Sequence, residues 1–425
     1  YDKAIAKGVQ DAVVYNNRGK ARMMLKEYPA AEADFTKALE LKSDYDRALE
    51  NRSEVRSLMN NWKGCAEDTD KLLASGRSDV ELYQRLGRAK FELKDYSGAA
   101  DALNRVVTRG VKDKDVFRML GLSLAQLGQC NEANRAFAAA VSMAVSDKEV
   151  FTRYGLCQFK EKEYASAIET LSRAIGMGEN SAEVFLVRGK AFAAQRDADR
   201  AQPDLEKALA AGLKDAEALR MLGDIRFGKN DFTAALNYYD QFLKAGVPDA
   251  QVFANRAQCK LKLNDTGGAL ADFTEALKIK PDLISALLGR GTLRFAKNDF
   301  SGCLEDLEKV RAATGETPDI LRMTGIAAWR NGQIDLARQR LETAMKAGVK
   351  DGKVALYTGY LRFERSDFAG STEALKQAEA AGENEVDLYL KRGKAYYKLN
   401  NYENAASDLQ RIAGSTTDRE AVEML

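Results

Sequence analysis

Six arginines and six aspartates form the most regular set of charged side chains in this 425-residue sequence, because each arginine is followed sixteen residues later by an aspartate. At the six equivalent pairs of positions in the 34-residue period described below, the first position has no arginine and the second has no aspartate. A guanidinium binds a carboxylate through two parallel hydrogen bonds, and residues that vary together usually touch. We therefore predict six ion pairs that join helices. A ligand-binding row of arginines is the alternative, disfavoured because every arginine has its own carboxylate. The pairs are Arg18 and Asp34, Arg52 and Asp68, Arg188 and Asp204, Arg256 and Asp272, Arg290 and Asp306, and Arg392 and Asp408.

Histidine does not occur in the sequence, and its absence removes much of the common chemistry of active sites. No histidine general base, Ser–His or Cys–His nucleophile, or histidine metal ligand is available. The sequence also contains no phosphate-binding glycine loop and no acidic cluster with metal-ligand spacing, so we find no convergent catalytic constellation. We predict that the chain is not an enzyme and expect no cofactor and no metal site. A mechanism based on carboxylates or lysine alone is the alternative.

Four of the five cysteines stand at places that other parts of the chain fill mostly with small apolar residues, Cys130 stands at the inter-helix turn, and no CxxC motif is present. We predict small buried hydrophobic side chains and no disulfide framework. Unpaired cysteines weakly favour the cytoplasm, and the bacterial periplasm is the alternative. The cysteines are Cys65, Cys130, Cys157, Cys259 and Cys303.

The overall charge is nearly balanced, with 65 basic and 63 acidic residues. This balance disfavours a nucleic-acid-binding or membrane-surface protein, although a local basic patch is compatible with it. No apolar stretch approaches the length needed to span a bilayer.

A period of 34 residues runs through the chain from residue 12 to residue 419 without insertion or deletion, and this span holds twelve units. Numbering each unit from its first residue (12, 46, 80 and so on), position 8 is always Gly, Ala or Ser, and position 20 is always small. Position 24 is mostly large and apolar, as in Phe35, Leu103 and Phe137. A fixed period of this size indicates a repeat array, and small residues recur where two helices approach closely.

Cap signals at the unit borders indicate two helices per unit. Side chains of N-cap type precede the first helix at Asp11, Asp79, Asp113, Asp147, Ser181, Asp215, Asp249, Thr317 and Asp351. Glycines end the second helix in one register, at Gly8, Gly76, Gly110, Gly178, Gly212, Gly246, Gly348 and Gly382. No strand-like alternation is present, so we predict an all-α fold.

The units resemble the tetratricopeptide repeat (TPR) over essentially the whole chain. The resemblance rests on the period, the small residues at positions 8 and 20, and an aromatic residue at the inter-helix turn, as in Tyr28, Tyr96 and Phe232. It implies an α-solenoid of twelve helix-turn-helix repeats in a right-handed superhelix, whose first helices line a concave groove. The chain departs from the family at position 11, which is often basic instead of aromatic, as in Arg22, Arg56 and Lys260.

The two ends match parts of a repeat. Residues 1–11 resemble the end of a preceding repeat, residues 12–419 hold the twelve repeats, and residues 420–425 resemble the start of a further repeat. Neither end has a polar capping repeat, and we interpret the chain as part of a longer protein.

The resemblance implies that positions 2, 5, 9, 12 and 13 face the groove. Exposed aromatic residues are typical anchors for partner segments, so we predict that the groove binds an extended or helical segment of a partner protein. Packing of these rings against the neighbouring first helix is the alternative. The predicted groove residues are Phe91, Phe159, Phe227, Phe295, Trp329, Phe363 and Tyr397 at position 12, and Arg118, Arg220 and Arg322 at position 5.

Three function classes follow. We favour a non-enzymatic scaffold for protein–protein interaction within a large multi-subunit assembly. The alternatives are a substrate-recruiting or regulatory arm of an enzyme whose catalytic domain lies outside this chain, and a helical-repeat RNA binder, which the near-neutral charge disfavours. The family's clamp for carboxyl-terminal tails resembles Lys at position 5 and Asn at position 9, and no unit carries either.

Overall fold

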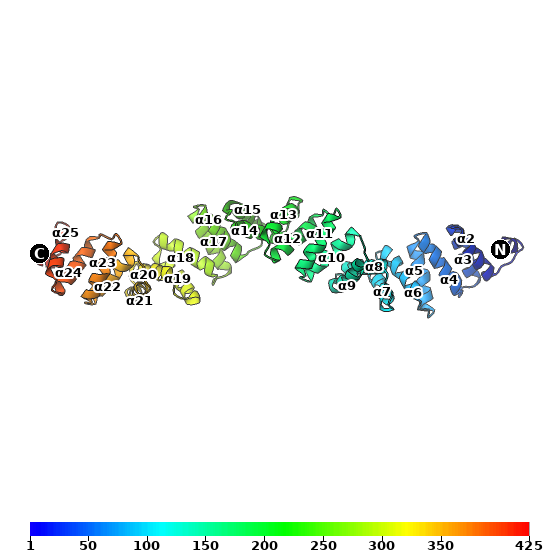
Figure 1. The fold of residues 1–425 in the computed structure, drawn as a ribbon, viewed down its shortest axis with the longest axis horizontal. Coiled ribbons are helices and arrows are strands. Elements are labelled where there is room, and N and C mark those ends of the chain that lie inside the picture. Colours follow the sequence, from blue (N-terminus) through cyan, green and yellow to red (C-terminus); the bar gives the residue numbers. More distant parts are fainter. Residues whose placement is uncertain (425) are drawn as a thin grey trace. The chain divides into compact units, whose positions relative to one another are not determined.

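The computed structural model describes residues 1–424, which form the α-helices α1 to α26 and no strand (Figure 1). The chain divides into two compact units, Tyr1–Ala218 and Leu219–Leu425. The prediction of an all-α fold built from helix pairs is confirmed. The superhelical hand stays a prediction.

Unit 1 holds six antiparallel helix pairs whose first helices begin every 34 residues. They are α2 (Ala12–Met24) with α3 (Tyr28–Leu41), α4 (Asp46–Leu58) with α5 (Trp62–Ala74), α6 (Val80–Glu92) with α7 (Tyr96–Thr108), α8 (Lys114–Gln126) with α9 (Cys130–Ser142), α10 (Lys148–Lys160) with α11 (Tyr164–Gly176), and α12 (Ala182–Ala194) with α13 (Ala198–Ala210). The short helix α1 (Asp2–Ala6) precedes them, in the segment predicted to end a preceding repeat.

Unit 2 begins within α14 and continues the same spacing. Its pairs are α14 (Ala216–Gly228) with α15 (Phe232–Lys244), α16 (Ala250–Lys262) with α17 (Thr266–Ile279), α18 (Ile284–Ala296) with α19 (Phe300–Thr314), α20 (Pro318–Arg330) with α21 (Ile334–Lys346), α22 (Gly352–Glu364) with α23 (Phe368–Ala380), and α24 (Val386–Lys398) with α25 (Tyr402–Ile412). The short α26 (Arg419–Glu423) overlaps the predicted start of a further repeat. Leu425, the last residue of that predicted start, lies outside the described residues.

The two helices of a pair cross most closely at position 8, where the side chain at position 24 lies against the glycine. A Cβ added to Gly155 would lie 2.6 Å from the side chain of Leu171, and one added to Gly121 would lie 2.6 Å from the ring of Phe137. Both opposing side chains are fully buried. The absence of a side chain at position 8 therefore lets a large apolar residue fill the seam between the helices.

Most of the predicted N-caps of the first helices form side-chain hydrogen bonds, but two do not. The side chains of Asp11, Asp113, Asp147, Asp215, Asp249, Thr317 and Asp351 accept hydrogen bonds from backbone N–H groups in the first turn. Asp79 and Ser181 stand at the N-cap positions, as predicted, but their side chains make no such bond. The carboxylate of Asp79 instead accepts a hydrogen bond of 2.8 Å from Nε of Arg77.

The turn inside each pair follows one pattern that the cap signals did not reveal. Two residues before each second helix, φ is positive, between 57° and 77°. This residue is a glycine in only two pairs, at Gly128 and Gly332, and elsewhere it is mostly Asn or Lys. The next residue is often Asp or Asn and caps the second helix, as when Asp265 accepts a hydrogen bond of 2.8 Å from the N–H of Gly268.

A substitution of Gly155 tests the close crossing. We expect Gly155→Ala to destabilise unit 1 by about 1–3 kcal/mol, because the added Cβ also lies only 3.2 Å from the backbone nitrogen of Leu171. Gly176→Ala is the matched control, since Gly176 lies at the end of the same pair with nothing within 4 Å of an added Cβ. We expect this control to be neutral or to stabilise by up to about 1 kcal/mol. Urea unfolding of both variants measures the difference, and equal losses would contradict the account.

Candidate partner-binding surface

All six arginines of the sequence pairs donate two hydrogen bonds to the aspartate sixteen residues later. Nε and Nη2 each bond one carboxylate oxygen, at 2.6–2.9 Å. The aspartates are at most 6% exposed. The hydrogen bonds to Asp306 raise the pKa of the Arg290 guanidinium. Each pair ties position 7 of a first helix to position 23 of the second helix, beside the close crossing at position 8, which is Gly in four of these six repeats and Ser53 or Ala257 in the other two.

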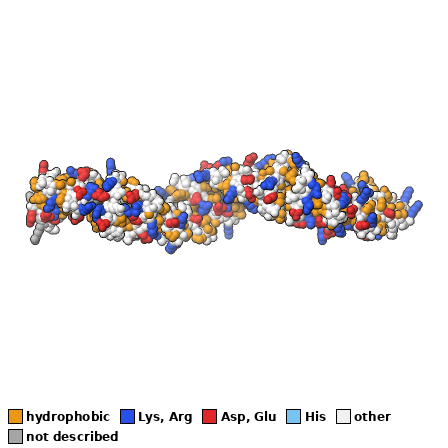
Figure 2. All heavy atoms as spheres, turned by 90° about the horizontal axis from the view of Figure 1, so that it is seen from below, with side chains coloured by type: hydrophobic (Ala, Val, Ile, Leu, Met, Phe, Trp, Pro, Cys, Tyr) orange, Lys and Arg blue, Asp and Glu red, His pale blue; other side chains and the backbone are white. Residues whose placement is uncertain are grey.

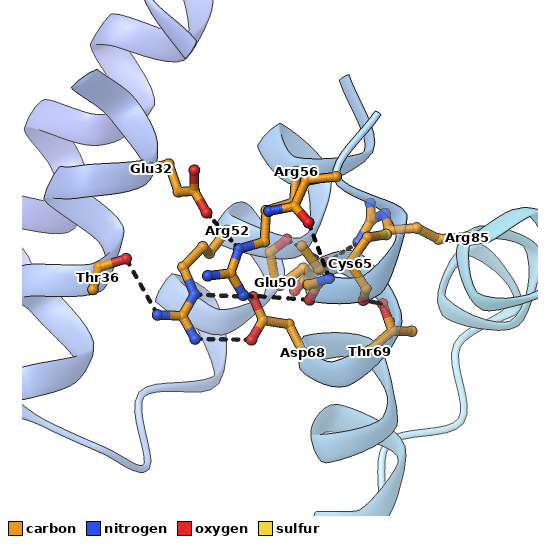
Figure 3. Close-up of polar contacts among 12 residues, drawn as sticks. Glu32, Thr36, Glu50, Arg52, Arg56, Cys65, Asp68, Thr69 and Arg85 are labelled. Carbon is orange, nitrogen blue, oxygen red and sulfur yellow. Dashed lines mark hydrogen bonds and ion pairs between the residues drawn. The ribbon is translucent and has the colours of Figure 1, made fainter. Parts of the chain in front are cut away.

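The remaining nitrogen of five of these arginines reaches the second helix of the preceding repeat. In four of them it donates to a side chain at position 25, whereas Nη1 of Arg392 lies 2.7 Å from a carboxylate oxygen of Glu379. Nη1 of Arg52 donates to Thr36 Oγ1 at 3.2 Å, and Figure 3 shows this bond beside the pair with Asp68. Arg188 donates in the same way to Ser172 at 3.0 Å, and Arg256 to Asp240 at 2.7 Å. The fourth bond joins Arg18 to Asp2 at 3.0 Å. Each of these arginines therefore joins three helices. Its Nε, Nη1 and Nη2 groups already donate hydrogen bonds within the protein.

The basic residues at position 11, which depart from the family pattern, bind the same aspartates. Nη1 of Arg56 donates to Asp68 at 2.8 Å, and Nη1 of Arg294 donates to Asp306 at 2.9 Å (Figure 3 shows the first). Arg22 and Lys260 also reach the aspartate of their own repeat, each at 2.8 Å. In four repeats, one buried aspartate therefore binds two basic side chains, one at position 7 and one at position 11. Position 11 is basic in all four of these repeats and apolar or aromatic in the other two that contain the pair, and this pattern was the signal available in the sequence.

In one repeat the arginine stands at position 23 instead. Arg340, which is 5% exposed, donates through Nε and Nη2 to the two oxygens of Glu308 in the preceding repeat, at 3.0 Å each. Its own position 7 is Thr324. The sixteen-residue spacing between arginine and aspartate joins residues of one repeat only. It therefore did not predict this pair, which joins two repeats.

Removal of one shared carboxylate tests these ion pairs. We expect Asp68→Ala to destabilise unit 1 by about 3–5 kcal/mol, because Arg52 would keep a partly buried charge without a carboxylate and Arg56 would keep only Glu32. Asp101→Ala is the control, an exposed aspartate of the second helix in the following repeat. Thermal unfolding of the two variants and the parent measures the loss. A cost as small as that of the control would show that the pairs contribute little.

The aromatic residues at position 12 are half-buried, except Tyr397, which is 37% exposed. Six of them contact an aromatic ring five residues later, at the start of the second helix of the same repeat. The centroid distances lie between 5.4 and 6.2 Å, for Phe91–Tyr96, Phe159–Tyr164, Phe227–Phe232, Phe295–Phe300, Phe363–Phe368 and Tyr397–Tyr402. These rings therefore brace the turn of their own repeat and expose only part of their surface.

Trp329 differs from the other position-12 residues because it packs on the next first helix. It stacks on Tyr357 with a centroid distance of 5.2 Å and lies 6.2 Å from the ring of Tyr360. Both tyrosines belong to α22 and are at most 6% exposed. Burial raises the pKa of Tyr360, whose hydroxyl has no hydrogen-bond partner among the described residues. For Trp329, packing against the neighbouring first helix is thus the observed arrangement.

The position-5 arginines already have carboxylate neighbours. The guanidinium of Arg118 lies over the ring of Phe91 at 5.9 Å and within 3.7 Å of Asp115 and Asp147. Arg322 repeats this arrangement over Phe295 at 5.8 Å, with Asp319 at 3.9 Å and Asp351 at 3.7 Å.

The third position-5 arginine, Arg220, donates to Asp224 at 3.2 Å. Because all three have such neighbours, an acidic partner segment would compete with these carboxylates.

A depression of about 480 Å³ is lined by residues of α18, α19 and α20, and the lining includes positions 2, 5 and 9, which the resemblance assigns to the groove. Leu288 at position 5 is 40% exposed and forms part of its wall. Arg322 and Asp319 stand at the same depression on α20. Its other lining residues are Ile284, Thr292, Val310, Thr314, Thr317, Ile320 and Met323. The sequence pattern did not predict this apolar depression, because the apolar residues it indicated for the groove were all aromatic.

The prediction that no cysteine is paired is wrong for two of the five. Cys130 and Cys157 form a disulfide between α9 and α10, with their Cα atoms 4.9 Å apart. The turn of one repeat lies against the first helix of the next, and this contact between repeats brings the two together. Cys65, Cys259 and Cys303 are free and buried. The disulfide removes the argument from cysteine usage for a reducing compartment.

Two features that could define another kind of site are absent from the described part of the chain. None of the helices there is both long and apolar enough to cross a membrane. No cluster of three or more Cys, Asp or Glu side chains in the same part of the chain is placed to hold a metal ion.

The tetratricopeptide repeat model matches residues 118–182, 186–229, 221–284, 322–385 and 356–419. Two further models with the same description match residues 12–45 and 81–109. The first model alone covers more than half of the chain, so the chain belongs to the tetratricopeptide repeat family. Proteins built from these repeats are generally non-catalytic scaffolds that bind other proteins.

Among known proteins, RNA polymerase II-associated protein 3 from Xenopus laevis is 31% identical over 100 residues, which are 22% of this chain and 15% of that protein. A tetratricopeptide repeat protein from Parabacteroides merdae is 20% identical, with a TM-score of 0.34 over 58% of this chain and 98% of its own. YrrB, described as a TPR protein with an unusual peptide-binding site, is 19% identical, with a TM-score of 0.39 over 45% of this chain and 99% of its own.

Proposed function

We propose that the chain is a non-enzymatic scaffold for a multi-subunit assembly, and that the first-helix face of unit 2 binds a segment of a partner protein. The observation that carries this proposal is the depression on α18 and α20. Its volume of about 480 Å³ is within the range of small binding pockets. Leu288 is 40% exposed inside it, in a family that binds protein partners.

The occupant is an amphipathic helical or extended segment that places a large apolar side chain against Leu288, Ile320 and Met323. The depression also has polar groups to orient such a segment. Arg322 lies 3.7 Å or more from its two carboxylates, so its N–H groups have capacity to donate, and the Asp319 side chain is 85% exposed and accepts hydrogen bonds. A preformed surface lowers the ordering cost of binding.

The alternative of RNA binding has less support. Basic and acidic side chains are interspersed over the face drawn in Figure 2, and the basic groups at position 5 have carboxylate neighbours. A phosphate-binding surface needs a continuous basic stripe, and its affinity would fall steeply with salt.

The depression is tested with Leu288→Lys in the intact chain. The probe is a peptide selected on the parent chain from a phage-displayed library. We expect Leu288→Lys to weaken this peptide at least roughly tenfold, because a buried ammonium would replace the apolar contact. Ile279→Lys, at a leucine-sized residue that is 45% exposed at the end of α17, is the control and should bind as the parent does.

Binding is measured by fluorescence anisotropy, with circular dichroism to check that both variants stay folded. Leu288 is a cleaner probe than Phe295 or Trp329, since both aromatic rings pack on other rings. Equal binding of the peptide to Leu288→Lys and to the parent would contradict the proposal.

A further inference from the structure

The disulfide joins two neighbouring repeats of unit 1 at a place where other repeats use an aromatic ring. Cys130 is the first residue of α9, at position 17, and Cys157 stands at position 10 of the next first helix, α10. Position 17 is aromatic in most repeats, and position 10 is mostly small. Trp62 and Ala89, for example, meet in one apolar cluster across the same junction in two earlier repeats.

Neither ring of the usual turn pair is present in the repeat that holds Cys130. Its position 12 is Ala125 and its position 17 is the cysteine itself. With two small side chains in place of two rings, this corner of the junction lacks the usual aromatic contact, although Phe137 and Tyr154 meet elsewhere across α9 and α10 at 5.6 Å. The covalent bond replaces that contact, and both cysteines belong to the apolar cluster around Met119, Leu120 and Leu124.

Cys259 occupies the same repeat position as Cys157 but has no partner cysteine. It also stands at position 10, but position 17 of the preceding repeat is Phe232. Burial raises the pKa of the Cys259 thiol to about 11 and that of Cys303 to about 12, and it also raises the pKa of Cys65. These three thiols stay protonated at neutral pH, so they react poorly with oxidants.

We propose that Cys130 and Cys157 are a redox-controlled staple between the fourth and fifth repeats, closed in oxidising surroundings and open in reducing ones. When closed, the staple fixes the turn of one repeat on the first helix of the next and stabilises unit 1. Both cysteines are 3% exposed, so the closed bond is shielded from small thiols until α9 and α10 separate locally.

Closure by oxidised glutathione takes two thiol–disulfide exchanges. One cysteine thiolate attacks a glutathione sulfur, which breaks the glutathione disulfide, forms a mixed disulfide and releases one glutathione thiol. The second cysteine then attacks the protein sulfur of the mixed disulfide, forms the Cys130–Cys157 bond and releases the second glutathione thiol. The two cysteine protons end on the two glutathione thiols, and two electrons pass from the protein to the glutathione disulfide.

The test uses the intact chain, incubated either with oxidised glutathione or with dithiothreitol. The chain is then unfolded with a denaturant in the presence of an alkylating reagent, which blocks every free thiol. Peptide mass mapping of the oxidised sample should show Cys130 linked to Cys157 and the other three cysteines alkylated. The reduced sample should show all five alkylated. The oxidised chain should also unfold at a temperature about 5 °C or more above the reduced chain.

Two variants separate the staple from a general redox effect. The difference in unfolding temperature should vanish in Cys157→Ser and persist in Cys259→Ser, which removes a cysteine at the same position of another repeat. If Cys157→Ser does not fold, peptide mapping of the unsubstituted chain decides. An unlinked pair after oxidation, no change in unfolding temperature on linkage, or a difference that persists in Cys157→Ser would each overturn the proposal.

Discussion

The close crossing of the two helices in each pair is the constraint on which the rest of the structure depends. At Gly155 there is no room for a Cβ, and Leu171 fills the space that a side chain would take. The crossing fixes which residues of the two helices face each other, so positions 7 and 23 come within hydrogen-bonding reach on one side of it. A bidentate pair between arginine and a buried aspartate then holds the crossing angle. Such a pair specifies geometry more than it adds stability, because both charges lose water on burial.

The same arrangement determines which side chains remain available on the proposed partner-binding surface. The most strongly bound arginines donate hydrogen bonds both to a buried aspartate of their own repeat and to the preceding repeat. Arg256, for example, donates to Asp272 and to Asp240. They are therefore occupied by the fold. What the first-helix face offers to a partner is instead apolar surface such as Leu288, together with arginines that are only loosely held, such as Arg322. If the proposed function is correct, specificity for a partner comes from shape and apolar contact more than from charge.

The sequence predicted the helix pairs, the crossing glycines and the contact between Arg290 and Asp306, because each is repeated at a fixed spacing and repetition acts as an internal alignment. It did not predict features that depend on contacts between repeats or occur once. The bond between Cys130 and Cys157 has no second copy with which to covary, and Arg340 pairs with Glu308 of another repeat. The positive φ before each second helix was missed because Asn and Lys occupy it more often than Gly. The aromatic residues were placed on the correct helices, but spacing alone does not reveal that Phe295 braces Phe300.

A double-mutant cycle on Arg290 and Asp306 tests the central claim most directly, because Asp306 is fully buried at the crossing of α18 and α19. The unfolding free energies of Arg290→Met, Asp306→Ala, the double variant and the parent give the coupling energy between the two side chains. The account predicts that the losses of the two single variants add up to about 2–3 kcal/mol more than the loss of the double variant, and this difference is the coupling energy. Additive losses, with a coupling near zero, would contradict the claim that this pair holds the two helices together.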